Sequence, residues 1–267
     1  MKISIITPVK NGEKYILETL RSIYDQGYPY LEHFVVDGMS KDKTLNIVSE
    51  FMQVNNLQNT HLIIKEDKNM YEAVNTGLNQ ISGDVFAYLN SDDCYCPDTF
   101  EMVSSYFRKH EDVDMIYGNA QYIDEEGKVL FWSNNPPFNF NRLVRAGTSW
   151  IMQPETFWRR RVLEKVGYFD TSYKLASDYE YLLRVAKSCK VMGVKDVLVK
   201  FRVHSGSLSV AQSQFSSEEA RNISQLYQTG TSIFANKILR ILDYIYIYAL
   251  LIRPKNSRYI LRKIVRR

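Results

Sequence analysis

Two adjacent carboxylates, Asp92 and Asp93, are the residues of this sequence with the clearest potential for chemistry. They follow the apolar run 85–89, whose β-branched and aromatic residues are typical of a strand buried on both faces. Ligands of open α/β sheets bind beyond the carboxyl ends of such strands. Neighbouring carboxylates there repel each other, and a hard divalent cation that also binds phosphate oxygens would relieve that repulsion. A solvated turn that caps the helix beginning near Pro97 accounts for the pair equally well.

Two further carboxylates stand at the ends of predicted elements. Asp37 follows the apolar run 31–36, where it could accept hydrogen bonds from a base or a ribose, or cap the next helix. Ser177 and Glu180 match a capping box, which leaves Asp178 free in the first turn of the helix that follows. Gly-rich dinucleotide and P-loop motifs do not follow the first predicted strand, so a dinucleotide dehydrogenase and a P-loop enzyme are disfavoured.

The elements that must position these carboxylates alternate in the first half of the chain. Strands predicted at 2–9, 31–36, 61–64 and 85–89 are separated by helical patterns, which indicates right-handed βαβ units and a parallel sheet. After residue 115 the alternation breaks. Short strands and a hairpin are predicted there, at 115–117, 121–124, 128–132, 191–194 and 197–203. The fold class is therefore α/β, with a mixed second half and a helical C-terminal extension that runs from about 217 toward 251.

Composition and charge further narrow the class of protein and the partners that it could bind. The 267 residues have the apolar and charged content of a globular protein, and the three cysteines form no disulfide framework, which points to a reducing cytoplasm. The segment 237–267 carries a net charge of +8, whereas the rest of the chain carries −4. Within it, residues 258–267 alternate basic and apolar types at helical spacing. We therefore expect 237–267 to bind an anionic membrane surface, with 258–267 as an interfacial helix, and docking on the protein body or on a partner is the alternative. The mildly acidic body argues against nucleic acid.

Several segments in order resemble the family 2 glycosyltransferases, especially the bacterial enzymes of capsule, exopolysaccharide and O-antigen assembly. The segments are 5–11, 35–44, 73–93, 153–157 and 167–180, and the resemblance covers about residues 1–205. It implies a GT-A fold, with a Rossmann-like, mostly parallel central sheet. A domain at 1–215 would then consist of a nucleotide-sugar-binding half at 1–117 and an acceptor half at 118–215. The basic helical extension, 216–267, lies outside the shared pattern.

The resemblance also implies roles for individual residues. Asp178 would be the catalytic base. Asp93 would bind Mn²⁺ or Mg²⁺, and Asp92 would contact the ribose or the same metal. Asn90 would also contact the nucleotide sugar, but it stands where the family often has Asp, which shifts ribose and metal contacts onto Asp92 and Asp93. The remaining donor contacts would come from Thr7, Pro8, Asp37 and Asp67. His204 is a lone histidine in a Ser-rich loop, a setting in which most histidines are structural or exposed.

These residues imply a transferase that moves a hexosyl-type sugar, with inversion, from a nucleotide-diphosphate sugar to a hydroxyl of a glycan or lipid-linked acceptor. The expected donor is a UDP-sugar. The process would be polysaccharide biosynthesis by a cytoplasmic protein, peripheral on the inner face of the cell membrane. Two alternatives are a nucleotidyltransferase and a non-catalytic, membrane-tethered binder of nucleotide or polysaccharide. The first alternative normally needs a Gly- and basic-rich triphosphate loop, which residues 7–14 do not resemble.

Overall fold

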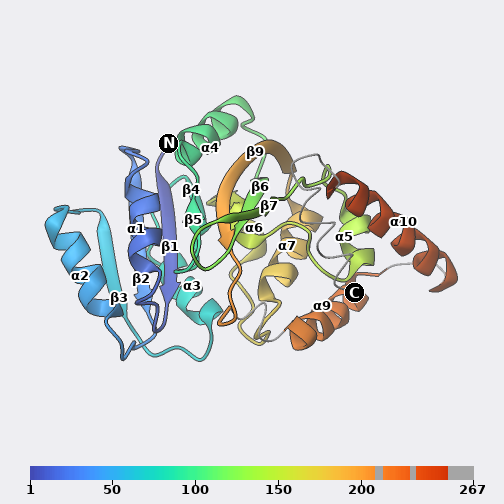
Figure 1. Cartoon of the computed structure of the whole chain (residues 1–267). Helices are drawn as coiled ribbons and strands as arrows, with labels where there is room; N and C mark the ends of the chain where they lie inside the picture. Colours follow the sequence, from blue (N-terminus) through green and yellow to red (C-terminus); the bar gives the residue numbers. More distant parts are fainter. Residues whose placement is uncertain (208–212, 229–232, 252–267) are drawn as a thin grey trace.

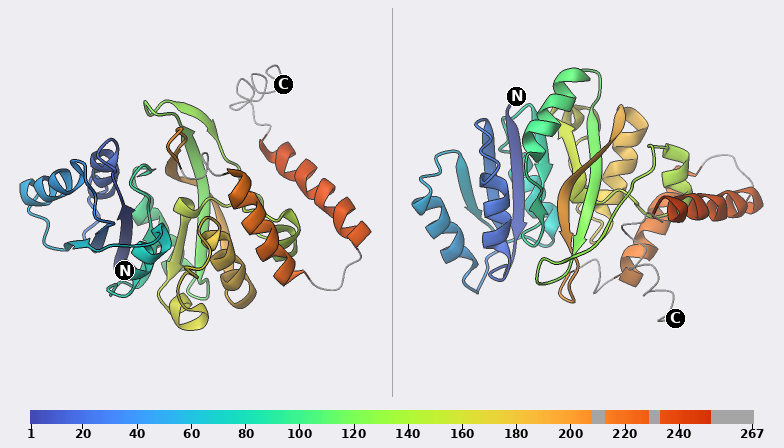
Figure 2. Two further views of the ribbon diagram at one scale, coloured as in Figure 1. Left: turned by 90° about the horizontal axis from the view of Figure 1, so that it is seen from below. Right: turned by 45° about the horizontal axis from the view of Figure 1, so that its top comes forward.

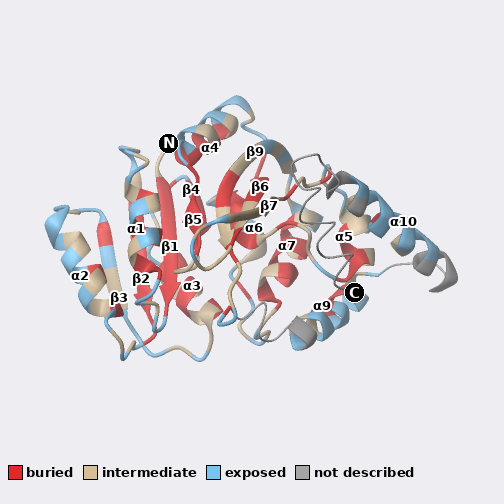
Figure 3. Cartoon of the chain, in the orientation of Figure 1, coloured by how far each residue is buried: buried red, intermediate tan, exposed pale blue. Residues whose placement is uncertain are grey.

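The structure is a computed structural model that describes residues 1–207, 213–228 and 233–251 (Figure 1). One curled sheet of nine strands runs through the molecule, in the order β3-β2-β1-β4-β8-β6-β9-β5, with β7 paired to β6. Buried residues concentrate along these strands and on the helix faces against them (Figure 3). The sheet therefore passes without interruption through both predicted halves of the chain.

The first half is parallel, as the alternation predicted. Its strands are β1 (Ile3–Val9), β2 (Leu31–Asp37), β3 (Thr60–Ile64) and β4 (Val85–Tyr88). They are joined by α1 (Ile16–Tyr24), α2 (Thr44–Val54) and α3 (Met70–Leu78). Val9 pairs with Asp37, and Asp37 pairs with Ile64. Because these strands end in register, the polar residues that follow them meet at one edge of the sheet.

The second half of the sheet is mixed. It contains β5 (Cys94–Tyr95), β6 (Met115–Ile123), β7 (Val129–Trp132), β8 (Thr156–Arg159) and β9 (Val191–Arg202). The β6–β7 hairpin is confirmed, and β8 is antiparallel to both of its neighbours. The strands predicted at 115–117 and 121–124 are one strand, as are those at 191–194 and 197–203. β6 and β9 pair in parallel along their whole length, and the register shifts near Asn119 absorb the irregularity that had suggested breaks.

The helices of the second half are α4 (Thr99–Lys109), α5 (Phe140–Ala146), α6 (Arg161–Val166), α7 (Ser177–Ser188), α9 (Ser213–Tyr227) and α10 (Ile233–Leu251), with a single 3₁₀ turn, η1 (Gln153–Glu155). The single helix predicted from 217 toward 251 is two helices, α9 and α10. Both lie at the end of the molecule remote from α2 (Figures 1 and 2). In the part of the chain that the structure describes, no helix is long and apolar enough to cross a membrane.

The run of three arginines that begins at Arg159 contributes to the scaffold. The Arg159 guanidinium donates to the main-chain carbonyls of Phe107 and Val113, and the Arg161 guanidinium donates to the Asp114 carboxylate over 2.6 Å. These bonds tie β8 and α6 to the connection between α4 and β6. Two of the three arginines are therefore engaged in holding the fold.

Candidate active site

The acidic turn after β4 separates its two carboxylates. Asp93 is buried, and its Oδ1 accepts the main-chain N–H of Arg202 over 2.9 Å, while its Oδ2 has no hydrogen-bond partner among the described residues. Asp92 is partly exposed, and its Oδ2 lies 2.9 Å from Nε2 of His204. Asp92 and His204 therefore form the carboxylate–imidazole pair on the accessible side of the turn, and Asp93 supports the turn from within.

Arg202, the last residue of β9, fixes this turn in place. Its side chain is 1% exposed, and its Nε donates to the Asp92 carbonyl over 2.9 Å. Its two terminal nitrogens donate to the Glu18 carboxylate and to the carbonyls of Asp124 and Glu125 in the β6–β7 hairpin. One guanidinium thus joins α1, the acidic turn and the hairpin, so His204, two residues further on, starts from a rigid base.

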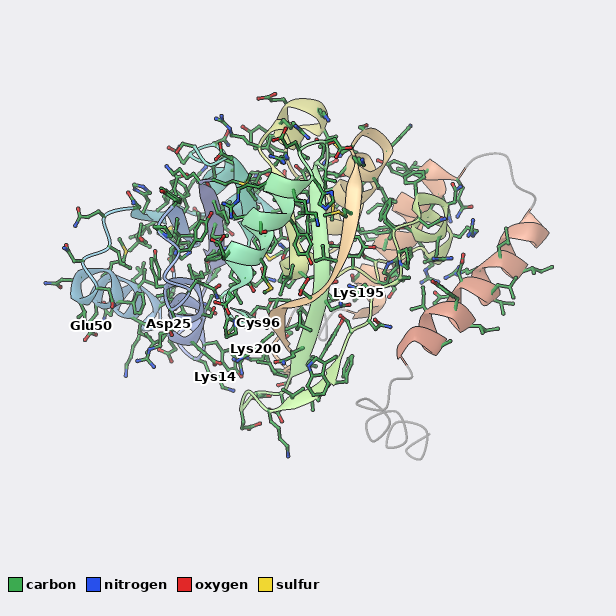
Figure 4. All side chains as sticks on the ribbon, turned by 90° about the horizontal axis from the view of Figure 1, so that it is seen from above. Lys14, Asp25, Glu50, Cys96, Lys195 and Lys200 are labelled. Carbon is green, nitrogen blue, oxygen red and sulfur yellow. The ribbon has the colours of Figure 1, made fainter. Side chains whose placement is uncertain are left out.

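The β6–β7 hairpin is also held from the loop before α1. Lys14, which Figure 4 labels, pairs with the Glu125 carboxylate over 2.6 Å. Both side chains are well exposed, so this pair stabilises the fold little. The contact between Lys14 and Glu125 instead helps to keep the β6–β7 hairpin on the same side of the sheet as the acidic turn.

Asp37, the last residue of β2, lies near Asp67, which follows the end of β3. Asp37 accepts the main-chain N–H of Ser40 with Oδ1 over 2.7 Å, and its buried Oδ2 has no partner within the described ranges. A Cβ atom added to Gly38 would lie 2.5 Å from Oδ2 of Asp67, so the two loops touch. Burial raises the pKa of Asp67, and the charge of Lys10 opposes that rise. Free carboxylate oxygens at this edge are suited to the hydroxyls of a ribose or the N–H groups of a base.

Thr7 and Pro8 are placed differently from these carboxylates. Both are buried within β1, and the Thr7 hydroxyl shares a 2.9 Å hydrogen bond with Nε2 of His33. The structure therefore does not bring the Thr7 side chain to the open edge. A nucleotide contact at these positions stays a prediction, and main-chain atoms would have to supply it.

The loop after β1 passes close to the acidic turn. A Cβ atom on Gly12 would lie 2.7 Å from Cγ2 of Val9 and 3.1 Å from Oγ of Ser91. Asn11, at a positive φ of 53°, donates its N–H to Ser40 and accepts the N–H of Lys41. The absence of a side chain at Gly12 thus lets the first loop approach the turn that follows Asn90, while Asn11 ties it to the loop after β2.

Asp178 lies in the first turn of α7. Its Oδ1 accepts the N–H of Tyr179 over 2.8 Å, and the buried Tyr71 hydroxyl also bonds to it. Burial raises the pKa of Asp178 to about 6, and the bonds from Tyr179 and Tyr71 oppose the rise. A helix N-terminus favours the charged carboxylate, so burial is the stronger influence here. A carboxylate with a pKa near 6 is well suited to accept a proton at neutral pH.

The capping box predicted for α7 is wrong. Ala176 is the N-cap, the Ser177 hydroxyl has no partner in the part of the chain described, and Glu180 binds Arg184 instead. The start of α7 is held from α9, because the Glu219 carboxylate accepts the main-chain N–H groups of residues 174, 175 and 176 over 2.7–3.0 Å. A residue 41 positions downstream of Asp178 thus fixes the turn that presents it.

Asp178 lines a pocket with an aromatic wall. The pocket residues include Gln153 of η1, Trp158 of β8 and Phe169. Gln153 donates its Nε2 to the Tyr88 carbonyl over 2.7 Å, whereas its Oε1 and the Nε1 of Trp158 are buried with no hydrogen-bond partner among the residues that the structure describes. Trp158 and Phe169 are each 3% exposed and pack on Phe86 and Tyr181, so these rings form the buried wall of a small pocket beside Asp178.

Tyr88 links this pocket to the acidic turn. Burial raises the pKa of its phenol far above 10, and the negative charges of Asp178 and Asp93 add to that rise. The Tyr88 ring packs against Trp158 and Phe169 of this pocket, with ring centroids 6.5 and 5.4 Å apart, and Tyr88 ends β4 two positions before Asn90. The structure therefore brings together Asp178 and the turn with Asn90, Asp92 and Asp93, residues that are far apart in sequence.

Sequence reasoning missed three residues of this site, and it gave Gln153 no individual role although Gln153 begins the family-like segment 153–157. His204 and Tyr71 belong to no motif that the sequence made informative, and Glu219 lies in the extension outside the resemblance. A signal existed only for His204, since it follows the end of a predicted strand at 197–203 and could share the edge where Asp92 lies.

Comparison with known proteins identifies the chain. The sequence model described as "Glycosyl transferase family 2" matches residues 4–167, more than half of the chain. The chain belongs to this family. The predicted resemblance to family 2 is confirmed.

Curated relatives within family 2 are moderately similar. An uncharacterized glycosyltransferase of Rickettsia typhi is 28% identical over 216 residues, which cover 76% of this chain and 64% of the relative. One from Rickettsia conorii is 28% identical and is covered for 34% of its length. A PGL/p-HBAD biosynthesis glycosyltransferase of Mycobacterium bovis is 29% identical, with 68% of both chains covered. The chain thus spans from about a third to two thirds of the length of these relatives.

Solved structures show the same architecture. TarS 1-349 of S. aureus, in complex with UDP-GlcNAc, matches with a TM-score of 0.67 at 20% identity, over 97% of this chain and 78% of TarS. The mannosyltransferase PcManGT of Pyrobaculum calidifontis, in complex with GDP-Man and Mn²⁺, matches with a TM-score of 0.64 at 18% identity, over 99% and 75%. At these identities the matches show the fold alone, and they confirm the GT-A fold expected for a family 2 member.

Proposed function

We propose that this family 2 protein transfers a sugar from a nucleotide-diphosphate sugar to an acceptor hydroxyl, with inversion at the anomeric carbon. The observation that carries the proposal is the position of Tyr88, whose ring packs against Trp158 and Phe169 of the pocket that Asp178 lines and which ends β4 just before the acidic turn. It supports one continuous site with a base of pKa about 6 on one side and an acidic turn on the other.

The nucleotide would bind at the edge formed by Asp37 and Asp67. The free oxygen of Asp37 is a ready acceptor for a ribose hydroxyl or a base N–H. From there the diphosphate would run toward Asn90 and Asp92, the direction in which the first loop approaches the turn. The UDP-GlcNAc complex of TarS and the GDP-Man complex of PcManGT support a nucleotide-sugar donor. We expect the donor to be a UDP-sugar.

Asp92 and His204 would hold a divalent cation. Across the described residues, no cluster of three or more His, Cys, Asp and Glu side chains has the geometry of a metal site. The protein would thus supply two ligands and leave the other positions to phosphate oxygens and water, as Mg²⁺ and Mn²⁺ sites on phosphates often do. The imidazole favours Mn²⁺ over Mg²⁺, because Mg²⁺ prefers oxygen ligands. When bound, the ion would neutralise charge on the diphosphate leaving group.

The sequence predicted Asp93 as the principal metal ligand, and the geometry favours a different division of roles. Asp93 uses one oxygen to hold the N–H of Arg202 and buries the other, while Asp92 presents its carboxylate beside His204. We therefore assign the metal contact to Asp92 and His204, and the support of the turn to Asp93.

Asp178 would act as the base. Its carboxylate takes the proton of the acceptor hydroxyl, and that oxygen forms a bond to the anomeric carbon from the face opposite the diphosphate. The bond from the anomeric carbon to the diphosphate oxygen breaks with its electron pair, so the products are the inverted glycoside and the nucleoside diphosphate. Positive charge develops at the anomeric carbon as this bond breaks, as in glycoside hydrolysis.

The two alternatives predict different outcomes. Family membership favours glycosyl transfer over nucleotidyl transfer. A non-catalytic binder would bind nucleotide at the same edge without turnover. Synthesis of a capsule, exopolysaccharide or O-antigen remains the expected setting, since the sequence resembles enzymes of that type.

Calorimetric titration of UDP, GDP and dTDP, each with and without Mn²⁺, tests the donor site. Metal-dependent binding of one nucleotide supports the proposal and names the donor base. A panel of the matching nucleotide sugars then follows release of nucleoside diphosphate, with Asp178→Asn as the control that should bind but not turn over. Folded protein that binds none of the three would overturn the donor site, and binding with no release from any sugar would favour the binder.

A further inference from the structure

α10 packs on the body through its charged side. Asp243 is 8% exposed, and its two carboxylate oxygens accept from Arg142 over 2.9 Å and from Arg145 over 2.8 Å, both on α5. The Arg142 guanidinium also stacks on the Tyr246 ring, with 4.4 Å between them. A carboxylate gripped by two arginines fixes the rotation of α10 about its own axis, because a turned helix would leave three charges unpaired.

The opposite side of α10 is apolar and faces solvent. Ile238, Ile241, Leu242 and Ile245 follow one another at helical spacing, and their side chains are 44%, 60%, 55% and 60% exposed. In the part of the chain for which burial is described, seven of the fourteen exposed large apolar residues lie on this one helix. Figure 3 shows its outer side as exposed. A surface helix normally turns such a stripe toward the core, so this reversed orientation marks an interaction surface.

The sequence that follows α10 indicates what covers this stripe. Residues 252–267 contain seven Lys or Arg and no acid. A basic segment next to an apolar helix face matches the two components of an anionic bilayer surface, charged headgroups above acyl chains. A second copy of the chain would bring two such basic segments together and repel. Since no described helix could span a membrane, α10 would lie in the plane of the interface.

We propose that the outer face of α10 inserts into the interfacial layer of an anionic membrane. The ion pairs of Asp243 with Arg142 and Arg145 would then hold the protein body at a fixed orientation relative to that membrane. This surface lies within the segment 237–267 that the sequence predicted to bind an anionic membrane, whereas the helix predicted at 258–267 lies outside the described residues. α5, which carries Arg142 and Arg145, also contacts α7, because its Leu143 carbonyl accepts a 2.9 Å hydrogen bond from the Tyr179 hydroxyl. The membrane face is thus coupled through α5 to the turn of α7 that presents Asp178.

Vesicle flotation without nucleotide tests the proposal independently of any transferase activity. The full chain is mixed with vesicles of phosphatidylcholine alone or with about one third phosphatidylglycerol. We expect it to float only with the anionic vesicles, and Ile241→Ser/Ile245→Ser to lower the bound fraction about tenfold or more, on the basis of the lost apolar burial. Tyr30→Ser/Val54→Ser removes two exposed apolar side chains from the first half of the chain, one just before β2 and one at the end of α2, and should bind as the wild type does.

Insertion is measured directly with an environment-sensitive fluorophore. In a Cys189→Ser background the two remaining cysteines, Cys94 and Cys96, are buried. A probe at Ile241→Cys should shift to the blue on anionic vesicles and be quenched by nitroxide lipids, whereas a probe at Val54→Cys should do neither. This measurement also decides the question if the double serine variant fails to fold.

Three results would overturn the proposal. Equal flotation of the Ile241→Ser/Ile245→Ser variant would assign membrane binding to the basic segment alone. If the wild-type protein does not float with anionic vesicles, a membrane is excluded as the partner of this face. Light scattering that shows a dimer for the wild type and a monomer for the variant would show that a second copy covers the face.

Discussion

The Asp92 carboxylate and the His204 imidazole are 112 positions apart in the chain and 2.9 Å apart in the structure. Asp92 follows the end of β4, and His204 follows the end of β9. Arg202, two residues before His204, donates a hydrogen bond to the main-chain carbonyl of Asp92. The fold thus builds a mixed oxygen–nitrogen pair from two strand ends, on the side of the turn that remains accessible.

Removal of either member of this pair should weaken metal-dependent nucleotide binding. We expect Asp92→Ala and His204→Ala each to raise the Kd for UDP in the presence of Mn²⁺ by about tenfold to a hundredfold, on the scale typical of ligand and support residues at metal sites. Binding without Mn²⁺ should change little. Titration calorimetry with and without the ion measures both values.

Asp93→Ala should act on stability instead. It removes the acceptor of the buried Arg202 N–H, so we expect a loss of roughly 1–3 kcal/mol in the free energy of unfolding, measured by urea denaturation. If Asp93→Ala keeps full stability yet abolishes Mn²⁺-dependent UDP binding, Asp93 is the metal ligand that the sequence predicted.

Asp178→Asn should lose transfer and keep donor binding. The amide cannot take the acceptor proton, so kcat should fall by about a hundredfold or more, the usual contribution of a general base. The Kd for UDP with Mn²⁺ should stay near that of the wild type. Transfer at an almost normal rate would remove Asp178 from the reaction.

The pKa of about 6 makes both activity and stability depend on pH through Asp178. The base must be ionised, so kcat/KM should rise with pH, reach half of its plateau near pH 6 and level off above about pH 7. The folded pKa lies above the unfolded value near 3.8, so the stabilising contribution of the protonated group is complete below pH 4 and is lost as the pH rises through 6. At pH 8, Asp178→Asn should therefore be more stable than the wild type by roughly 1–3 kcal/mol. Thermal melts at pH 5 and 8 check the sign.

Tyr71→Phe isolates the hydrogen bond that holds Asp178 in its charged form. The Tyr71 hydroxyl lowers the pKa of Asp178, so its removal should move the midpoint of the kcat/KM profile to higher pH while the plateau is reduced only modestly. An unchanged midpoint would mean that a group other than Asp178 sets the acid limb.

Glu219→Ala should loosen the start of α7 from a distance. Three main-chain N–H groups lose their acceptor, so we expect roughly 1–3 kcal/mol less stability and a clear fall in kcat. Glu218→Ala, one residue earlier and exposed, is the matched control and should stay within about 0.5 kcal/mol of the wild type. Equal effects of the two changes would contradict the capping role.

The sequence by itself determined the parallel half of the fold. Apolar runs that alternate with helical patterns require buried strands joined by crossovers, and Asp37 and Asp92 follow such strands, so their place at one sheet edge could be predicted from periodicity alone. The ordered segments also sufficed to predict the family, because their joint order and spacing are far more specific than any one of them.

Only the tertiary structure decided how the carboxylates divide their roles. Asp92 and Asp93 are indistinguishable by type and neighbour in the sequence, and burial against Arg202 separates them. The raised pKa of Asp178 results from its burial beside Tyr71, and the capping of α7 by Glu219 comes from another helix. The outward apolar stripe of α10 also depends on tertiary contacts, since Asp243 sets its rotation by meeting two arginines on α5. Local patterns fix elements, whereas desolvation and long-range pairing fix the chemistry of the side chains they carry.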